Sequence, residues 1–155
     1  MNADIRYEYC NASDPKFIKL TDELDIELSQ RYGAGQAKYD AYNRIVNAHA
    51  VIAMDGVMTA ACGCFKPYDA ETVEIKRMYV KPEYRGRGVA RELLKRLEAQ
   101  AKLQGYQASV LETGRKQPEA IRLYEKSGYE RIQNYGQYAD IPDSVCFKKL
   151  FPEAD

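Results

Sequence analysis

A strand, a short basic turn and a helix follow one another between residues 73 and 104, and this succession constrains the fold more than any other part of the chain. The strand-like run ends at Val80, and the turn contains Gly86 and Gly88. The helix is indicated by apolar side chains that recur at three- and four-residue steps: Val89, Leu93, Leu94, Leu97 and Ala101. Glycines at the start of a helix let an anion approach the N–H groups that the first turn leaves unpaired. The segment therefore predicts a site for a phosphorylated ligand, at the end of a strand in an open α/β sheet.

The spacing of the turn limits which phosphorylated ligand fits. No G-x-x-x-x-G-K-[S/T] run exists, so the main signature of a nucleotide-hydrolysing P-loop is missing. A dinucleotide-binding motif comes closer, because Gly86 and Gly88 precede a helix and Glu112 follows at about the expected distance. The third glycine position, however, holds Arg91, whose large side chain does not suit the close helix–strand packing of that motif. The dinucleotide alternative is therefore disfavoured.

Two segments resemble a known family. Arg85-x-x-Gly88-x-Ala90 is similar to the pyrophosphate-binding motif R/Q-x-x-G-x-G/A of the GNAT (N-acetyltransferase) superfamily. Residues 117–129, QPEAIRLYEKSGY, are similar to the family's N-x-x-A-x-x-L-Y-E-K-x-G-F segment, with Gln117 where the family often has Asn. The two motifs occur in the family's order and cover residues 73–130. The resemblance implies a small, bacterial-type, single-domain acetyltransferase.

The fold that the resemblance implies is an α/β fold with a mixed sheet of about seven strands, four helices and two splayed central parallel strands that admit an acyl thioester. Hydrophobic periodicity, caps and turns along the chain predict the same order of elements. The predicted elements are a strand over 5–9, a helix from Ser13-Asp14-Pro15 to about 32, a short helix to about Arg44, strands over 49–54 and 57–65 joined by Asp55-Gly56, a strand over 71–80, a helix over 88–104, a strand over 107–112, a helix from Pro118 to about 128, and strands over 129–133 and 144–149.

Length and composition predict one domain over residues 1–155. The formal net charge is zero with both signs interspersed, which indicates no general affinity for nucleic acid or for an anionic membrane. No apolar run approaches the roughly 20 residues that cross a bilayer, and the N-terminus lacks a signal pattern, so we expect a cytoplasmic protein. The four cysteines do not have zinc-like spacing, and no metal is expected.

Catalytic roles follow from the resemblance. Glu74 coincides with the strand carboxylate that acts as general base in histone-type members, and Glu112 is the reserve candidate. An ordinary strand residue paired with Lys76 or Arg77 is the alternative interpretation of Glu74. Tyr124 matches the tyrosine that lies beside the cofactor sulfur in many members, where it would act as general acid rather than only pack in the core.

Acetyl-CoA is the co-substrate that the resemblance implies. Its pantetheine arm would meet backbone groups of the strand, and its pyrophosphate would meet the basic turn. The residues predicted to bind it are Met78, Tyr79, Val80, Arg85, Gly86, Arg87, Gly88, Val89, Ala90 and Gln117. A covalent route through Cys62, Cys64 or Cys146 is less favoured than direct transfer, and the lone His49 has no evident acidic partner.

The acceptor site should lie outside the matched motifs, and residues 31–44 and 134–138 are the candidates. The leading hypothesis is acetylation of a primary amine on a small or amino-acid-like molecule. A protein lysine or N-terminus as acceptor, and a CoA-binding sensor without turnover, remain alternatives. A homodimer is compatible with the resemblance, although no sequence feature specifies an interface.

Overall fold

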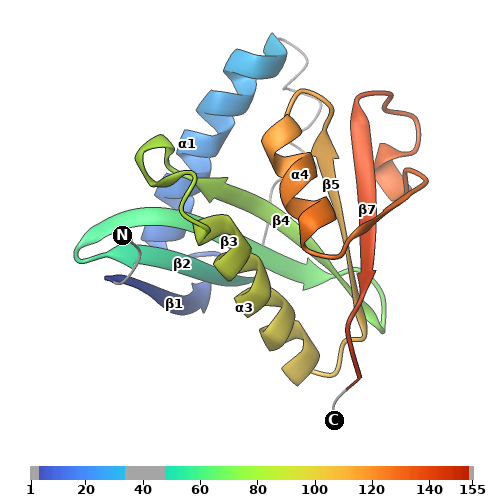
Figure 1. Cartoon of the computed structure of the whole chain (residues 1–155), viewed down its shortest axis with the longest axis horizontal. Helices are drawn as coiled ribbons and strands as arrows, with labels where there is room; N and C mark the ends of the chain where they lie inside the picture. The colour runs from blue at the N-terminus through green and yellow to red at the C-terminus, as the bar shows by residue number, and fades with distance from the viewer. Residues whose placement is uncertain (1–3, 34–47, 154–155) are drawn as a thin grey trace.

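A seven-stranded mixed sheet forms the centre of the molecule, in the order β1-β2-β3-β4-β5-β7-β6 (Figure 1). The structure is a computed structural model, and it describes residues 4–33 and 48–153. The elements are β1 (Ile5–Asn11), α1 (Pro15–Tyr32), β2 (His49–Asp55), β3 (Met58–Pro67), β4 (Thr72–Val80), η2 (Pro82–Tyr84), α3 (Val89–Leu103), β5 (Ala108–Gly114), α4 (Pro118–Lys126), β6 (Glu130–Ile132), η3 (Gly136–Tyr138) and β7 (Ser144–Leu150). The predicted α/β fold with a mixed sheet of seven strands is confirmed.

The helices begin where the sequence places their caps. Asp14 is the N-cap of α1, and its carboxylate accepts a hydrogen bond from the backbone N–H of Lys16 at 2.9 Å. The described residues contain three α-helices, whereas four were predicted. The remaining one, the short helix to about Arg44, falls outside the described residues. No helix in the described part of the chain is long and apolar enough to cross a membrane.

The β2–β3 hairpin differs by one residue from its prediction. Asp55 pairs with Met58, so the two-residue turn is Gly56-Val57 rather than Asp55-Gly56. Gly56 has φ +62°, and a glycine at the first turn position suits the turn type whose twist matches two antiparallel strands. The backbone requirement of Gly56 therefore sets the register.

The two parallel central strands separate part-way along their length. Pairing between β4 and β5 covers only Thr72–Ile75 against Ala108–Leu111, although both strands continue beyond it. On its other edge β5 stays paired with β7 as far as Gly114. Arg77 in β4 has φ +60°, a left-handed conformation that non-glycine residues rarely adopt, next to an irregularity in the pairing with β3. The predicted splay of the central strands is thus present and opens a gap in the sheet.

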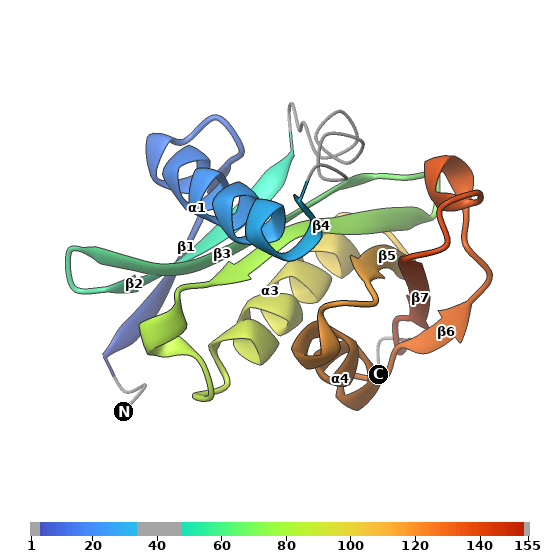
Figure 2. The same cartoon turned by 90° about the horizontal axis from the view of Figure 1, so that it is seen from above.

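Helices cover the sheet on both faces (Figure 2). α1 packs on one face, where Phe17, Leu20 and Leu24 join a core with β2 and β3. α3 and α4 pack on the other face, where Leu93, Leu97 and Tyr124 belong to a second core. The splayed ends of β4 and β5 are therefore reached from both the α1 face and the α3 face.

Candidate functional site

A cleft of about 370 Å³ lies between the separated ends of β4 and β5. Its walls come from β4, the first turn of α3, the end of β5, α4 and one side of α1. Most of the residues predicted from the sequence line it together: Met78, Tyr79, Val80, Arg85, Gly86, Gly88, Val89, Ala90, Gln117 and Tyr124. Glu74 and Arg87 are not among its lining residues. Glu112, the reserve candidate for the base, does line the cleft.

The glycine turn forms one end of the cleft. Gly86 and Gly88 have φ +77° and +78°, the left-handed region that favours glycine. A Cβ at either position would meet no atom within 4 Å, so the space beside the turn is open. Gly88 is the N-cap of α3 and brings no side-chain cap, which leaves the first N–H groups of the helix without a capping partner from that residue. The turn therefore fits a phosphate group by its backbone donors, its open space and the positive end of the helix dipole.

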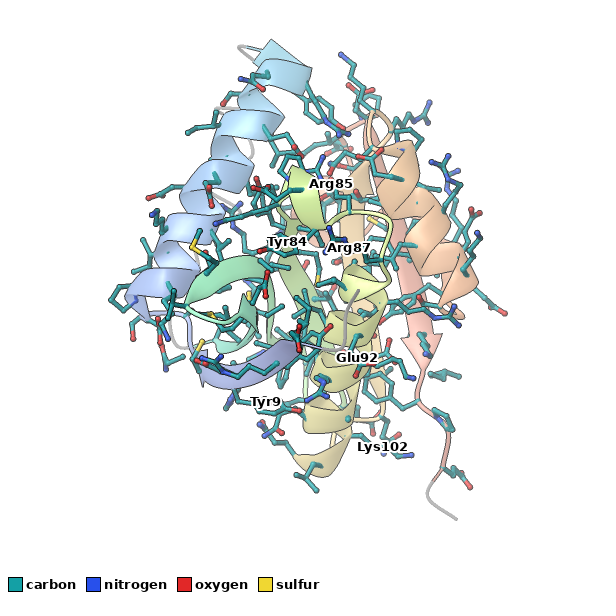
Figure 3. All side chains as sticks on the ribbon, turned by 60° about the vertical axis from the view of Figure 1, so that its left-hand side comes forward. Tyr9, Tyr84, Arg85, Arg87, Glu92 and Lys102 are labelled. Atoms are coloured by element: carbon teal, nitrogen blue, oxygen red, sulfur yellow. The ribbon has the colours of Figure 1, made fainter. Side chains whose placement is uncertain are left out.

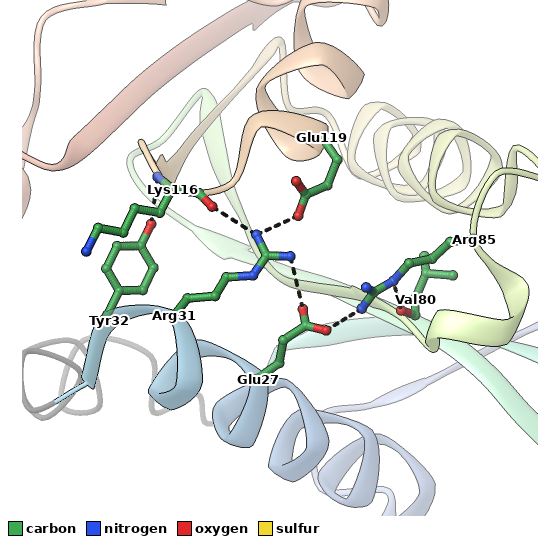
Figure 4. Close-up of polar contacts among 7 residues, drawn as sticks. All are labelled: Glu27, Arg31, Tyr32, Val80, Arg85, Lys116 and Glu119. Atoms are coloured by element: carbon green, nitrogen blue, oxygen red, sulfur yellow. Dashed lines mark hydrogen bonds and ion pairs between the residues drawn. The ribbon is translucent and has the colours of Figure 1, made fainter.

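The two arginines of the turn, labelled in Figure 3, have different partners. Arg85 lines the cleft, and its guanidinium donates to the carbonyl of Val80 at 2.8 Å. The same guanidinium pairs with Glu27 of α1 at 2.6 Å (Figure 4). Arg87 instead stacks over the ring of Tyr84, with 5.4 Å between the guanidinium carbon and the ring centroid. Of the two arginines of the turn, Arg85 is thus the one that lines the cleft, and Arg91 of α3 lines it as well.

Tyr124 lies at the wall of the cleft formed by α4. Its side chain is buried, with ring contacts to Tyr129 and Phe147 at centroid distances of 5.8 and 6.1 Å. Burial, and secondly the charge of Glu112, raise the pKa of the Tyr124 hydroxyl well above its ordinary value. The hydroxyl therefore stays protonated near neutral pH, as a proton donor must. Tyr124 therefore packs in the core and also lines the cleft.

Glu74 lies in a buried network of side chains beneath the cleft. Its carboxylate is 2 % exposed and accepts a hydrogen bond from the hydroxyl of Tyr135 at 2.7 Å. The amines of Lys76 and Lys66 lie 3.7 and 3.9 Å from the same carboxylate. The nitrogen of Lys76 donates to the hydroxyl of Tyr138 at 2.7 Å. The alternative expectation, that Glu74 pairs with Lys76, matches the structure, whereas Arg77 pairs with Asp25 of α1.

Glu112 reaches the cleft directly from β5. Its carboxylate accepts a hydrogen bond from the hydroxyl of Ser144 at 2.7 Å. Burial raises its pKa and the charge of Glu74 adds to the increase, while Ser144 and Lys76 oppose it without cancelling it. A carboxylate with a raised pKa is a stronger base than an exposed one once it is ionised. The geometry therefore favours Glu112 over Glu74 as the carboxylate that an amine in the cleft can contact.

The family that this cleft indicates is also the one that the sequence matches. A family model described as the acetyltransferase (GNAT) family matches residues 16–129. The chain belongs to the GNAT family.

Two curated relatives of this GNAT protein are 41% and 33% identical to it. The first is an IAA acetyltransferase of Azospirillum brasilense, matched over 76 residues that cover 49% of this chain and 50% of the relative. The second is an uncharacterized N-acetyltransferase of Bacillus subtilis, YsnE, matched over 100 residues that cover 63% of this chain and 66% of the relative. The matched region thus spans about half to two thirds of the length of these relatives.

Solved GNAT structures share the fold over almost the whole chain. A Klebsiella pneumoniae protein described as an acyl-CoA N-acyltransferase superposes with a TM-score of 0.76 at 27% identity, covering 93% of this chain and 97% of the other. A GNAT family acetyltransferase of Elizabethkingia anophelis, solved with acetyl-CoA bound, superposes with a TM-score of 0.68 at 18% identity, covering 96% and 99%. The second likeness concerns the fold alone.

The thiols and the histidine of the GNAT chain are poorly placed for chemistry. Burial raises the pKa of the Cys64 thiol to about 12, and it is the main cause that raises that of Cys146 to about 11. Burial also raises the pKa of Cys62 well above its ordinary value. Because the thiolate is the nucleophile, a covalent route through these residues is disfavoured. His49 stacks on Phe65 at a centroid distance of 5.2 Å.

The acceptor-side residues were the least predictable part of the site. Of the two predicted acceptor segments, residues 134–138 lie against β4 through Tyr135 and Tyr138, whereas 34–44 of the other fall outside the described residues. Tyr32, at the end of α1, falls within the predicted acceptor segment 31–44 and lines the cleft, whereas the sequence gave no role in the site to the other α1 residues that line it, Leu24, Glu27 and Leu28. Their spacing of three and four residues marks one helix face, but nothing in that spacing distinguishes a face that lines a cleft from one that packs in a core.

Proposed function

We propose that this protein is an acetyl-CoA-dependent N-acetyltransferase that transfers an acetyl group directly to a primary amine of a small or amino-acid-like molecule. The observation that carries the proposal is a single cleft that joins a phosphate-binding turn to the carboxylate of Glu112 and the hydroxyl of Tyr124. Family membership and the acetyl-CoA-bound neighbour support the identity of the co-substrate. Acyl transfer from a CoA thioester requires a phosphate-binding site, a general base and a general acid, and the cleft brings candidates for all three together.

The binding roles follow the walls of the cleft. Backbone N–H groups of the turn and of the first turn of α3 would hold the pyrophosphate, with Arg85 as the nearby cation. Backbone groups of Met78 to Val80 would hold the pantetheine arm, because the separation of β4 from β5 leaves that edge of β4 without a strand partner in β5. Gln117 lines the opposite wall and could contact the same arm.

The chemistry requires one bond to form and one to break. The amine nitrogen attacks the thioester carbonyl carbon, the C–N bond forms, the C–S bond breaks, and CoA leaves as a thiolate. Glu112 would accept the proton that the amine loses, and Tyr124 would donate a proton to the departing sulfur. Glu74, the base that the family resemblance suggests, would act on Glu112 and Lys76 through charge, because it does not line the cleft.

Binding and turnover test the proposal separately. Thermal unfolding with equal concentrations of acetyl-CoA, NAD and ATP should show a selective rise of the midpoint with acetyl-CoA. Thiol release should then appear with a panel of small primary amines and be weaker with a lysine peptide. A rise with NAD alone would overturn the cofactor assignment, and turnover of the peptide alone would replace the small amine by a protein acceptor.

Substitution of the acid provides a test of its role. Tyr124→Phe should leave the dissociation constant of acetyl-CoA nearly unchanged and lower kcat about tenfold, since a thiolate of pKa near 8.5 needs only modest help from an acid. Equal losses of binding and turnover would instead indicate that Tyr124 only packs in the core.

A further inference from the structure

The last turn of α1 is attached to the turn between β5 and α4 by several polar contacts (Figure 4). Arg31 donates to the carbonyl of Lys116 at 3.0 Å and pairs with Glu119 of α4 at 2.7 Å. The backbone N–H of Lys116 donates to the hydroxyl of Tyr32 at 3.2 Å, and the amine of Lys116 lies 5.4 Å from the centre of the same ring. The two walls of the cleft, α1 and the β5–α4 turn, are thereby joined at this point.

Gly114 makes this attachment sterically feasible. A Cβ built at Gly114 would overlap the hydroxyl oxygen of Tyr32 and lie 2.6 Å from the ring carbon that bears it. Gly114 has no positive φ, so the position does not need glycine for its backbone conformation. The need is for space: the Tyr32 ring lies directly against the end of β5.

Tyr32 and α3, the helix that follows the glycine turn, lie on opposite sides of the cleft. That turn opens α3, which packs on one face of the sheet, whereas Tyr32 belongs to α1 on the other face (Figure 2). An acyl thioester that enters from the α3 face leaves the α1 face for the incoming amine. Tyr32 lines the same cleft as Glu112, and its ring lies against Gly114, two residues further along β5 from Glu112.

We propose that Tyr32 determines the size of the acceptor amine, because its ring forms the α1-side wall next to Glu112 and Gly114 leaves the space in which that ring lies. The inference rests on the proposed N-acetyltransferase activity and deepens it. It assigns the acceptor to primary amines on a slender chain, since an aromatic wall joined to the opposite side of the cleft limits the width available. Arg31 is a positioning residue in this arrangement, because its contacts with Lys116 and Glu119 hold the last turn of α1, which carries Tyr32, against the β5–α4 turn.

The test compares acceptor size across variants. Thiol release is measured with ethylamine, butylamine and phenethylamine, and the ratio of kcat/KM for phenethylamine to that for ethylamine is the readout. Tyr32→Ala should raise this ratio about tenfold or more, the scale of discrimination that a few methylene groups provide. Tyr32→Phe keeps the ring and should leave the ratio within about twofold of wild type. Gly114→Ala should displace the ring and change the ratio in the same direction as Tyr32→Ala.

Controls separate the wall from general damage. Tyr9→Ala removes an exposed tyrosine of β1, 53% exposed, and should leave the ratio unchanged. The double variant Tyr32→Ala/Gly114→Ala should match Tyr32→Ala alone, because both changes act on one ring. Calorimetric binding of acetyl-CoA and the unfolding midpoint identify variants that have lost the fold. Folded variants with an unchanged ratio overturn the inference alone, whereas a wild type that binds acetyl-CoA but acetylates no amine overturns the proposed function and the inference with it.

Discussion

The glycine turn, residues 85–88, and the buried network around Glu74 lie near the same cleft but are built in different ways. The turn is one continuous stretch whose backbone is bent at Gly86 and Gly88. The network joins side chains that are 61 and 62 residues apart, from β4 to Tyr135 and Tyr138. Apart from changes to Arg85, side-chain changes in the turn should therefore be tolerated unless they alter its backbone, whereas the network depends on each hydroxyl and charge that it contains.

The largest effect should come from Glu112, the carboxylate of β5 that lines the cleft. Glu112→Gln should lower kcat by about 10²–10⁴-fold, the range of general-base contributions, with little change in acetyl-CoA binding. The variant should also unfold at a higher temperature near neutral pH. A carboxyl whose folded pKa is raised costs stability as pH rises from its unfolded pKa through its folded pKa, and glutamine removes that cost.

The pH dependence distinguishes the two carboxylates. Activity of the wild type should rise as pH increases through the raised pKa of Glu112. Ser144→Ala removes a hydrogen bond that lowers this pKa, so the rising limb should move to higher pH. Glu74→Gln removes a negative charge that raises it, so the limb should move to lower pH. If Glu74→Gln instead abolishes the rise of activity with pH, Glu74 is the base.

The turn should respond strongly to a change of backbone. Gly88→Val places a β-branched side chain at φ +78°, and we expect acetyl-CoA binding to weaken about 100-fold as the first turn of α3 rearranges. Gly105→Val is a matched control, since Gly105 has φ +98° and open space but does not line the cleft. Both variants should lose roughly 1–2 kcal/mol of stability, and only Gly88→Val should lose binding in calorimetry. Equal binding losses would show that the turn has no special role.

The same contrast explains what could be predicted from the sequence. The elements around the turn, their order and the parallel pair β4–β5 follow from local periodicity and from glycines whose backbone requirement is visible in the chain. Glu112 was only the second candidate for the base. The sequence does not reveal that the two central strands separate after Ile75, and so it does not reveal which carboxylate lines the gap between them. Likewise, nothing local pairs Tyr135 with Glu74 or Tyr32 with Gly114, since those contacts exist only after strands and helices distant in the chain have packed.

A smaller effect is expected from a single hydroxyl of the network. Tyr135→Phe leaves the buried Glu74 carboxylate without its 2.7 Å donor, which should cost about 1–3 kcal/mol of unfolding free energy. For a chain of this size that corresponds to a fall of roughly 2–12 °C in the unfolding midpoint. Tyr68→Phe is the matched control, because Tyr68 is 45% exposed and touches the edge of Tyr135 without bonding Glu74. Equal midpoints for the two variants would mean that the network is less tightly coupled than its geometry indicates.

The smallest effect concerns the charge that connects α1 to the turn. Glu27 pairs with Arg85 at 2.6 Å, and a pyrophosphate at the turn would compete for the same guanidinium. Glu27→Gln should therefore tighten acetyl-CoA binding, by about two- to fivefold, since a partly exposed ion pair contributes about 0.2–1 kcal/mol. Calorimetry at low and high salt should show the gain shrinking as salt screens the charges. Glu27 also pairs with Arg31 at 3.9 Å, so Glu119→Gln, which breaks a pair with Arg31 but none with Arg85, is the control and should leave the affinity unchanged. Weaker acetyl-CoA binding in Glu27→Gln would contradict the expected competition and would mean that Glu27 orients Arg85 toward the phosphate. The site at the turn would then depend on side chains as well as on the backbone.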